Sequence, residues 1–481
     1  MGQHDGGRPT SAAIIGGGVA GLQAARALLA RANFAQVTVF ERHDEVGGVW
    51  RRNYAGYGAQ VTRTQYHMPE LDPAELDWYP EGRQLARQAR QFAAQFLSGE
   101  RCSLLKNTEV TALRQTADGR WRVSYIAHTS PPGKQAPTTS IYDVVIMATG
   151  LFSRPRVPIS KESRRHGPPI AVHSSDLVDL EILRGLRVVI VGMGKSACDL
   201  AMAAAQVAQS VDAVARNPTW LLPRRFLGIP VRFLSSTRWF AALTLGQRQG
   251  PKAQALQTFL WRWILEPLVR WHFGRVPAAW RPTDDGLREQ LWHGRSLAIV
   301  DAPSLQDALT APHVRCIRAE PSRLSPDGLI VRSAGSGLGT APHASVGESL
   351  LEADAVIWAT GYDSDAAGPS ILDDATLSQL RRPGSEELAL YEYVLPVSDE
   401  LRGLAFIGRV LSTSDVTVSF VQAEWRPSIR ELSRCHRPLS APLRQNTTWP
   451  CTAAASVPRP RTTRRSRCRR STATWIGSSR S

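Results

Sequence analysis

The sequence predicts an α/β fold in which one strand–turn–helix–strand unit occurs twice. An apolar strand runs into a glycine-rich turn near residue 16, and a similar strand runs into a second such turn near residue 192. Each unit is followed further along the chain by a buried strand that ends in Ala-Thr-Gly, at 148–150 and at 359–361. Two glycine turns and two such strands in this order indicate two Rossmann-like, dinucleotide-binding units.

The first unit extends from Ala12 to Glu41. Its strand leads into Gly16-x-Gly18-x-x-Gly21, and an Ala- and Leu-rich helix follows. The first glycine permits the tight turn, the second lets the backbone approach a pyrophosphate, and the third lets the helix pack on the strand. N–H groups at the helix start hold phosphates, and Glu41 ends the second strand, where an acid bonds ribose hydroxyls. This order of features favours an FAD or NAD site over an ordinary glycine-rich turn.

The second unit repeats this pattern with one change of charge. Its elements are a strand at 186–191, the turn Gly192-x-Gly194-x-x-Ala197, an Ala-rich helix at 198–208 and a strand at 211–215. Arg216 stands at the end of that strand, where the first unit has Glu41. A cation at this position accommodates a 2′-phosphate, so the second unit is expected to bind NADPH. The alternative is that Arg216 is a solvated arginine at a strand end.

The other elements follow from their residue patterns. We expect a helix at 83–98, short strands at 109–114 and 121–127, buried strands at 142–150 and 353–362, a strand and turn at 402–411, and a helix from about Ser419. Loops rich in Pro and Thr (130–140), in Pro (154–158) and in Gly and Ser (333–349) separate them.

Residues 220–295 contain seven of the chain's fourteen tryptophans and are expected to form a helical insertion. Such an insertion would line a substrate channel or rest on a membrane surface. The simpler alternative is a helical layer packed on the sheet.

Composition is typical of a globular protein, with 43% hydrophobic and 21% charged residues. No apolar run is long enough to cross a bilayer, and residues 1–10 lack the apolar core of a signal peptide, so the cytoplasm is the expected compartment. The six cysteines are scattered without a C-x-x-C pair. Their spacing argues against a metal site, a disulfide framework and a dithiol redox centre.

The net charge of +16 is concentrated at the C-terminal end. Residues 436–481 hold ten Arg, no Lys and no acid, so the folded part is not expected to bind nucleic acid. Residues 435–481 show no hydrophobic periodicity and are expected to be disordered. The chain has five Lys against 53 Arg, which is typical of GC-rich coding, and a frameshift near residue 434 is therefore favoured. A native basic tail that binds nucleic acid or anionic lipid is the alternative.

With these motifs the chain resembles the flavin-containing monooxygenases, of the wider class B flavoprotein monooxygenases, over roughly residues 11–433. The shared elements are G-G-G-V-A-G-L (16–22), Glu41, G-G-V-W (47–50), A-T-G (148–150), V-G-M-G-K-S-A-C-D-L-A (191–201), A-T-G-Y (359–362) and F-I-G (406–408). The resemblance implies an FAD-binding domain at 11–153 and 331–434, and an NADPH-binding domain at 154–330 inserted into it.

The resemblance also implies individual cofactor contacts. For FAD they are Gly16, Gly18, Ala20, Gly21, Glu41, Arg42, Gly48, Val49, Trp50, Thr62, Val110, Ala148, Thr149 and Gly150. For NADPH they are His173, Ser174, Gly192, Gly194, Lys195, Ser196, Ala197, Arg216, Thr360, Gly361 and Tyr362.

The implied activity is a monooxygenation in which the cofactor carries the chemistry. NADPH reduces FAD, the reduced flavin takes up O2 as a C4a-hydroperoxide, and a small, apolar substrate is oxygenated at N or S. In the Baeyer–Villiger variant, a peroxyflavin attacks a ketone. The rivals are an NADPH oxidase, a flavin disulfide reductase, which the missing cysteine pair disfavours, and a catalytically impaired cofactor-binding protein. Peripheral membrane contact is an option, and the oligomeric state is not predicted.

Three departures from the family pattern leave the substrate class open. The flavin-facing stretch T-N-x-x-K reads 62–66 T-R-T-Q-Y, so Arg63 replaces the Asn. Arg63 is interpreted either as a cation that stabilises a peroxyflavin anion or as a salt-bridged surface arginine. Of the family's F-x-G-x-x-x-H-x-x-x-(F/Y/W) signature, His173 and Ser174 survive. His173 is expected to be structural or to touch NADP rather than transfer a proton. Lys195 stands where the family usually has Asn.

Overall fold

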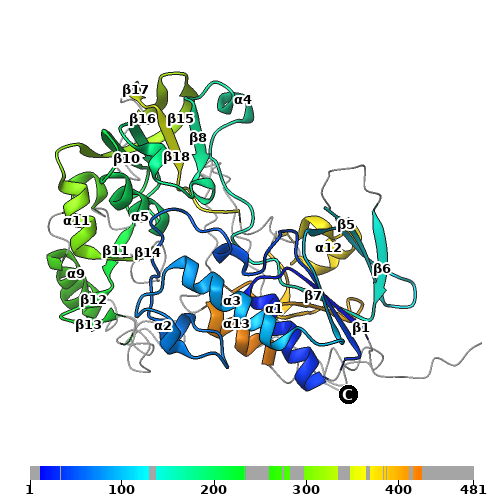
Figure 1. Cartoon of the computed structure of the whole chain (residues 1–481). Helices are drawn as coiled ribbons and strands as arrows, with labels where there is room; N and C mark the ends of the chain where they lie inside the picture. The colour runs from blue at the N-terminus through cyan, green and yellow to red at the C-terminus, as the bar shows by residue number, and fades with distance from the viewer. Residues whose placement is uncertain are drawn as a thin grey trace, which may run out of the picture. The chain divides into compact units, whose positions relative to one another are not determined.

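Apolar runs at the start of the chain form the centre of a five-stranded parallel sheet (Figure 1). In order across the sheet, its strands are β21 (Leu404–Phe406), β7 (Val144–Met147), β1 (Ser11–Ile15), β2 (Gln36–Phe40) and β3 (Cys102–Leu105). Strands covered on both faces read as continuous apolar runs, and every residue of β7 is buried. The predicted strands at 142–150 and 402–411 thus lie side by side in this sheet.

This computed structural model describes residues 11–32, 34–128, 137–231, 233, 259–272, 276–281, 297–333, 347–363, 369–382, 384–385, 387–410 and 415–424. All of them lie in the unit Met1–Gln445. The predicted tail at 435–481 and most of the predicted insertion at 220–295 lie outside the described residues.

Alternate residues of β1 serve two different cores. Ala12 and Ile14 pack with α1 (Val19–Ala27) and α3 (Gly82–Phe96). Ala13 and Ile15 pack on the antiparallel sheet of β4 (Thr108–Gln115), β5 (Trp121–Ala127) and β6 (Thr138–Tyr142). Successive side chains of a strand point to opposite faces, so one apolar run anchors both layers. The helix α13 (Asp415–Glu424) lies beside α1, and α1 continues into a π-helix at Leu28–Ala32.

The second unit forms a seven-stranded sheet. Its order is β17 (Glu348–Glu352), β16 (Gly328–Ser333), β15 (Val314–Ser325), β10 (Ser210–Ala215), β9 (Arg187–Val191), β18 (Ala355–Trp358) and β8 (Ile170–His173). Pairing from β15 to β8 is parallel, whereas β16 and β17 are antiparallel. The helices α5 (Lys195–Ala204) and α11 (Ala302–Thr310) pack on one face. All seven strands fall between β7 and β21 in sequence, so the second unit is inserted into the first.

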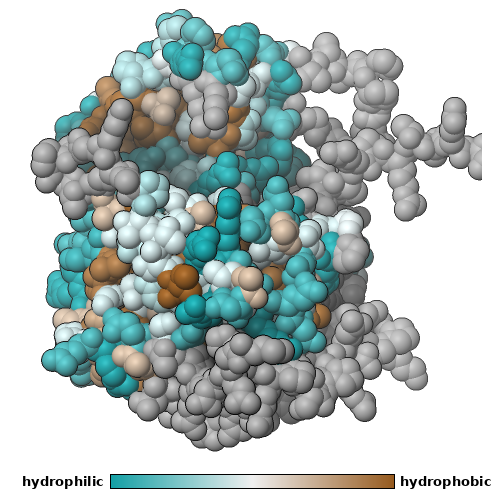
Figure 2. Space-filling view, turned by 90° about the vertical axis from the view of Figure 1, so that its right-hand side faces the viewer, coloured by the Kyte–Doolittle hydropathy of each residue, from teal (hydrophilic) through white to brown (hydrophobic). Residues whose placement is uncertain are grey.

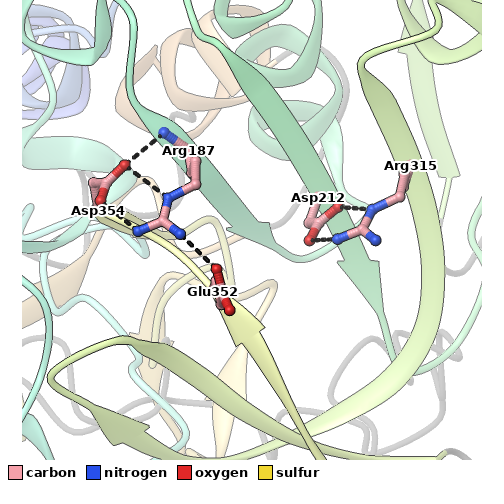
Figure 3. Close-up of polar contacts among 5 residues, drawn as sticks. All are labelled: Arg187, Asp212, Arg315, Glu352 and Asp354. Atoms are coloured by element: carbon pink, nitrogen blue, oxygen red, sulfur yellow. Dashed lines mark hydrogen bonds and ion pairs between the residues drawn. The ribbon is translucent and has the colours of Figure 1, made fainter.

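An aspartate directly before the strand that leads into each Ala-Thr-Gly turn, β7 or β18, holds the start of the strand beside it. Asp143 Oδ2 accepts hydrogen bonds from the backbone N–H of Ser11 at 2.9 Å and from its hydroxyl at 3.0 Å. Asp354 Oδ2 accepts from the N–H of Arg187 at 2.9 Å, and its carboxylate also holds the Arg187 guanidinium (Figure 3). Glu352 accepts from the same guanidinium at 2.7 Å. The hydrogen bonds from Arg187 lower the pKa of Asp354 to about 2.

Charge pairing also joins β10 to β15. Asp212 and Arg315 are register partners, and their side chains form a two-pronged ion pair with Nε–Oδ1 at 2.6 Å (Figure 3). The carboxylate is buried, while the guanidinium is exposed. Such a bidentate pair fixes the two strands in one register.

Shorter elements complete the described residues. The strand pairs are β11 (Trp220–Pro223) with β14 (Leu297–Val300), β12 (Arg225–Phe226) with β13 (Ile229–Pro230), and β19 (Leu390–Tyr391) with β20 (Leu395–Pro396). The helices are α2 (Arg63–Tyr66), α4 (Lys161–Arg164), α12 (Asp374–Leu380) and α9 (Glu266–His272), the last preceded by a π-helix at Trp261–Leu265. Short 3-10 turns occupy Gly48–Trp50, Pro73–Glu75, Ser174–Asp176, Glu181–Leu183, Ala278–Trp280 and Pro369–Ile371.

The described part of the predicted insertion is mixed. Residues 220–223 form a strand instead of a helix, because they pair with β14. Trp220 and Trp280 are buried, and Trp280 packs in the core of the second sheet, as a helical layer would require. Trp263 and Trp271 are 66% and 72% exposed. Hydrophobic residues on the face shown in Figure 2 occur in separate patches among hydrophilic ones.

The predicted α/β class and the inserted arrangement are confirmed, with shifts at element ends. The helix expected at 198–208 begins at Lys195, because it starts directly after the turn glycine. The helix expected from Ser419 begins at Asp415 among the described residues. Residues 138–140, expected in a loop, belong to β6, where two threonines pair with β5. No helix in the described ranges has the length and apolar character that crossing a membrane requires.

Candidate functional site

The two glycine turns have the same backbone. Gly16 and Gly192 both adopt a positive φ, +113° and +133°, which side chains other than glycine's disfavour. A Cβ on Gly16 would lie 2.5 Å from the carbonyl oxygen of Ala148, and one on Gly192 would lie 2.3 Å from that of Ala359. The first glycine is therefore required in each unit by its φ and by the close approach of the Ala-Thr-Gly strand.

The third position of the turn differs between the units. A Cβ on Gly21 would lie 1.9 Å from the carbonyl oxygen of Gly16, so only glycine fits there. The second unit accommodates Ala197 at the same place, fully buried against the core. The predicted role of this position in close packing applies strictly to the first unit alone.

The second glycine of each turn faces room for a ligand. Gly18 and Gly194 have ordinary φ values of −73° and −75°, so their lack of a side chain does not serve the backbone conformation. A Cβ on Gly18 would meet only Gly48 at 3.5 Å, and one on Gly194 would meet no described atom within 4 Å. Each stands at the N-cap of its helix, α1 or α5, without a side-chain cap. Free helix-start N–H groups beside such room fit a pyrophosphate.

The Ala-Thr-Gly turns lie next to these helix starts. Gly150 and Gly361 have φ values of +69° and +76°, and no described atom lies within 4 Å of a Cβ at either. Thr149 Oγ1 is buried without a hydrogen-bond partner among the described residues. The Thr360 hydroxyl, in the matching position, donates to the carbonyl of Arg156. A buried hydroxyl of this kind in the first unit fits a cofactor with polar groups.

Glu41 is held in place by backbone hydrogen bonds. It is buried, and its carboxylate accepts hydrogen bonds from the N–H of Gly17 at 2.8 Å and of His43 at 2.9 Å. A Cβ on Gly17 would lie 2.9 Å from that of Glu41, so the middle glycine of G-G-G is needed for this contact. Sequence reasoning missed Gly17, although the triple glycine was its signal. Arg42, the next residue, is exposed and donates to the carbonyl of Ser153 at 3.4 Å.

Arg216 stands at the end of β10, as predicted. Its side chain is 55% exposed, and its Nη1 lies 3.4 Å from Glu320 Oε1, which is equally exposed. An exposed pair of this kind is weak, so the guanidinium is available to a ligand. The opposite charges at the two strand ends are therefore present in structure as well as in sequence.

The G-G-V-W segment packs against the first turn. Gly47 and Gly48 have positive φ values, and the Gly47 N–H donates to the carbonyl of Gly17 at 2.9 Å. Trp50 is buried, whereas Val49 is 46% exposed. Of the three predicted FAD contacts in this segment, Gly48 thus lies next to Gly18 of the first turn, Val49 is exposed and Trp50 is buried.

Other predicted FAD contacts lie deeper or further away. Ala20 faces the F-I-G turn, where a Cβ on Gly408 would come within 2.7 Å of it. Val110 is a buried residue of β4 in the core between the two sheets of the first unit. Thr62 is buried and its hydroxyl lies 2.9 Å from that of Thr64. Their side chains therefore pack within the protein.

His173 is engaged on both ring nitrogens. Its Nε2 lies 3.0 Å from the carbonyl oxygen of Gly361, and its Nδ1 lies 2.9 Å from the hydroxyl of Ser175. Burial lowers its pKa below the ordinary value of 6.5, and the ring packs on Tyr362 with centroids 5.1 Å apart. A neutral imidazole that donates to the Ala-Thr-Gly turn fits the structural interpretation. Ser174 is buried beside it.

Lys195 lies at the first position of α5, with the half-buried Ser196 after it. Its ammonium forms a buried ion pair with Asp199, and both side chains are at least nine-tenths inaccessible. Burial lowers the pKa of Lys195, while Asp199 opposes this. The sequence analysis assigned Lys195 to NADPH and did not single out Asp199. In the structure the Lys195 ammonium points to the Asp199 carboxylate.

Arg63, the first residue of α2, differs from the salt-bridged interpretation in the partners that the structure describes. Its Nη1 donates to the carbonyl of Leu76 at 3.0 Å, and its guanidinium lies 5.6 Å from the ring centroid of Trp78. These described partners are a carbonyl and an indole instead of a carboxylate. The catalytic role of Arg63 stays a prediction.

The described cysteines are free thiols with suppressed reactivity. Burial raises the pKa of Cys102 to about 11 and that of Cys198 and Cys316 to about 12. Thiolates are the reactive form, so these residues are poorly suited to dithiol chemistry. Within the described ranges no cluster of His, Cys, Asp and Glu could hold a metal ion.

Comparison with known proteins agrees with this geometry. A family model described as pyridine nucleotide-disulphide oxidoreductase matches residues 10–228. The chain is 25% identical over 453 residues to flavin-containing monooxygenase 3 of Rattus norvegicus, which covers 87% of this chain and 73% of the relative. It is 25% identical over 452 residues to dimethylaniline monooxygenase [N-oxide-forming] 2 of Macaca mulatta, covering 89% and 74%.

Solved structures show the same fold at lower identity. The polycyclic ketone monooxygenase from the thermophilic fungus Thermothelomyces thermophila superposes with a TM-score of 0.64 at 18% identity, over 88% of this chain and 76% of that one. OTEMO in complex with FAD and NADP gives 0.61 at 17%, over 89% and 86%. The predicted resemblance is therefore confirmed: the chain is a relative of the flavin-containing monooxygenases and has the two-unit fold of these flavoprotein monooxygenases.

Proposed function

We propose that this protein is an FAD- and NADPH-dependent monooxygenase that transfers one oxygen atom from O2 to a small organic substrate. The observation that carries the proposal is the pair of matched turns with opposite charge at their strand ends. Glu41 is buried and fixed beside the first turn, whereas Arg216 is half-exposed beside the second. An acid suits ribose hydroxyls and a cation suits a 2′-phosphate, so FAD belongs to the first turn and NADPH to the second.

The first unit would hold FAD along one continuous surface. Gly16 and Gly18 would admit the pyrophosphate, Glu41 the ribose, and Gly48 to Trp50 and the 148–150 turn would line the remainder. The second unit would hold NADPH through Gly192, Gly194, Arg216 and the 359–361 turn. The corresponding domain limits, 11–153 with 331–434 and 154–330, are part of this proposal.

When bound, the flavin supplies the redox and oxygen-transfer chemistry. The chain's residues bind and orient the cofactors and exclude water from them. His173 would hold the second Ala-Thr-Gly turn by its bond to Gly361, without moving a proton. Arg63 would place a positive charge near the reacting oxygen, since negative charge develops there.

Two substrate classes fit the relatives. An N-oxide-forming enzyme is among the sequence relatives, and a polycyclic ketone monooxygenase is among the structural ones. A cation at position 63 favours the ketone class, because that chemistry builds more negative charge. A cytoplasmic location is proposed from the sequence alone. The exposed Phe259, Trp263, Ile264 and Trp271 are the surface that a peripheral membrane contact would use.

The test is the absorbance spectrum of the purified chain. We expect flavin to copurify, to bleach with NADPH rather than NADH in air-free buffer, and to recover on readmission of oxygen. A panel of a tertiary amine, a thioether and a cyclic ketone then assigns the substrate class from the oxygenated product. Protein that cannot take up FAD contradicts the proposal. If every compound instead gives one H2O2, formed from O2, for each NADPH oxidised to NADP+, the protein is an oxidase.

A further inference from the structure

A buried charged cluster connects the helix of the second turn to a segment of the first unit. Asp199 lies on α5 and its side chain is 1% exposed. It receives the ammonium of Lys195 from its own helix. From the first unit it receives the hydroxyl of Tyr54 at 2.7 Å and the backbone N–H of Gly58 at 3.5 Å. A single carboxylate therefore gathers donors from two parts of the chain that lie about 145 residues apart.

Residues 54–58 of the first unit pack closely against this cluster and its helix. The ring of Tyr57 lies 5.9 Å from the Lys195 ammonium and stacks edge-on against Tyr54, with centroids 5.3 Å apart. Gly56 has a φ of +79°, and a Cβ on it would lie 2.9 Å from that of Ala203, two turns of helix from Lys195. The segment 54–58 is thus seated along α5. Removing one donor from a buried charge leaves that charge poorly compensated, so the contacts depend on one another.

Both ends of this connection lead to a cofactor turn. Lys195 is the first residue of α5, directly after Gly194. Tyr54 lies four residues after Trp50, which closes the segment that packs on the first turn. A shift of the cluster would therefore change the separation of the two turns.

We propose that Tyr54, Lys195 and Asp199 are positioning residues that set the second-turn helix at the distance from the first turn that reduction of the flavin by NADPH requires. The inference rests on the proposed function. It departs from a role of Lys195 as a ligand of the NADPH pyrophosphate, because the ammonium is committed to Asp199. Transfer rates fall steeply when reacting groups are misplaced by about 1 Å, so a small shift has a large kinetic effect.

The two roles of Lys195 predict changes in different quantities, NADPH affinity in one case and the rate of flavin reduction in the other. A pyrophosphate ligand would make Lys195→Met weaken NADPH binding, and would make Asp199→Asn strengthen it by freeing the ammonium. A positioning cluster makes both changes lower the limiting rate of flavin reduction, with little change in the dissociation constant for NADPH. The hydroxyl deletion Tyr54→Phe should act in the same direction, although it removes no charge.

The experiment uses the full chain with FAD, mixed anaerobically with NADPH in a stopped-flow spectrometer. For Tyr54→Phe and Lys195→Met we expect a limiting reduction rate at least tenfold lower, with FAD content unchanged and the NADPH dissociation constant within about threefold. The double variant should be no slower than the slower single one. The matched control is Tyr125→Phe, which removes a hydroxyl that bonds to Ser140 between β5 and β6. This change should leave the reduction rate unchanged.

Hydrogen exchange provides a readout that does not need activity. Tyr54→Phe should raise exchange in peptides covering both 51–58 and 195–204, and Tyr125→Phe in neither. Faster exchange confined to 51–58 overturns the inference, as does an unchanged reduction rate in Tyr54→Phe. If NADPH does not reduce the flavin of the wild-type protein, the proposed function is refuted. Faster exchange in both peptides of Tyr54→Phe would still show that the cluster couples segment 54–58 to α5.

Discussion

The two nucleotide-binding turns share their backbone and differ in the side chains around it. Gly16 and Gly192 have similar positive φ values and meet the same carbonyl of their Ala-Thr-Gly strands. Glu41 and Arg216, at the matching strand ends, differ in charge and also in burial. Under the proposed assignment, the shared backbone would bind the pyrophosphate that both cofactors contain, and the two side chains would bind the riboses that differ.

The difference extends into how each strand-end residue is held. In the first turn the backbone N–H of the middle glycine, Gly17, donates a hydrogen bond to Glu41. The second turn has Met193 there, buried in the core, and the partner of Arg216 among the described residues, Glu320, is exposed. A preorganised acid suits a cofactor that stays bound, whereas a loosely held cation suits one that exchanges at each turnover.

The largest expected effect comes from the second glycine of each turn. Gly18→Ala should abolish copurification of FAD, because the new methyl group occupies room for the pyrophosphate. Gly194→Ala should leave FAD bound and raise the dissociation constant for NADPH at least ~10-fold. Neither change strains the backbone or meets a close contact, so thermal unfolding of the cofactor-free chain should change little.

This pair of variants tests the assignment of the two sites directly. Flavin content by absorbance and NADPH titration by fluorescence provide the two measurements. Loss of FAD from Gly194→Ala with retention in Gly18→Ala would reverse the assignment.

Arg216→Gln should be next in size. Loss of a charge-assisted hydrogen bond to the 2′-phosphate costs about 1.5–3 kcal/mol, which is roughly a 10- to 100-fold rise in KM for NADPH. The KM for NADH should stay the same, since NADH lacks that phosphate. Glu320→Gln is the matched control, because it removes the ion-pair partner and leaves the cation. Equal losses for NADPH and NADH would show that Arg216 does not read the phosphate.

The strands and turns that the two units share could be predicted from the sequence, because they depend on residues that are close along the chain. Apolar runs predicted the strands and glycine spacing predicted the turns, since each pattern extends over only a few residues. The buried cluster of Lys195, Asp199 and Tyr54 was not predictable, because its members come together only through the tertiary fold. The Glu320 partner of Arg216, 104 residues away, was hidden for the same reason. Lys195 looked like a phosphate ligand because its local position suits one.

A pH effect separates the two Ala-Thr-Gly turns. In the second turn a histidine, His173, bonds to Gly361, and burial lowers the pKa of His173 below 6.5. Between 6.5 and that lowered pKa the unfolded chain binds more protons than the folded one, so the unfolding free energy falls as pH falls through this window. His173→Gln should make the dependence shallower, as measured by urea unfolding at pH 5 to 7. An equally steep dependence in the variant would assign it to His43, whose pKa burial also lowers.

The smallest expected effect concerns the two aspartates, Asp143 and Asp354, that precede the strands leading into the Ala-Thr-Gly turns. Asp143→Ala should lower the unfolding free energy by about 1 kcal/mol, because it leaves the N–H of Ser11 without its acceptor. Asp354→Ala breaks more contacts, yet we expect a similar loss of about 1 kcal/mol. Its ion pair with Arg187 is more than a third exposed, and water screens it.

Salt distinguishes the two aspartates. The cost of Asp354→Ala should shrink in about 0.5 M salt, where exposed charges are screened, and the cost of Asp143→Ala should not. Urea unfolding of both variants at low and high salt measures this. A salt-independent cost at both positions would show that the backbone bond, common to the two units, does the holding and that the Arg187 guanidinium adds only exposed charge.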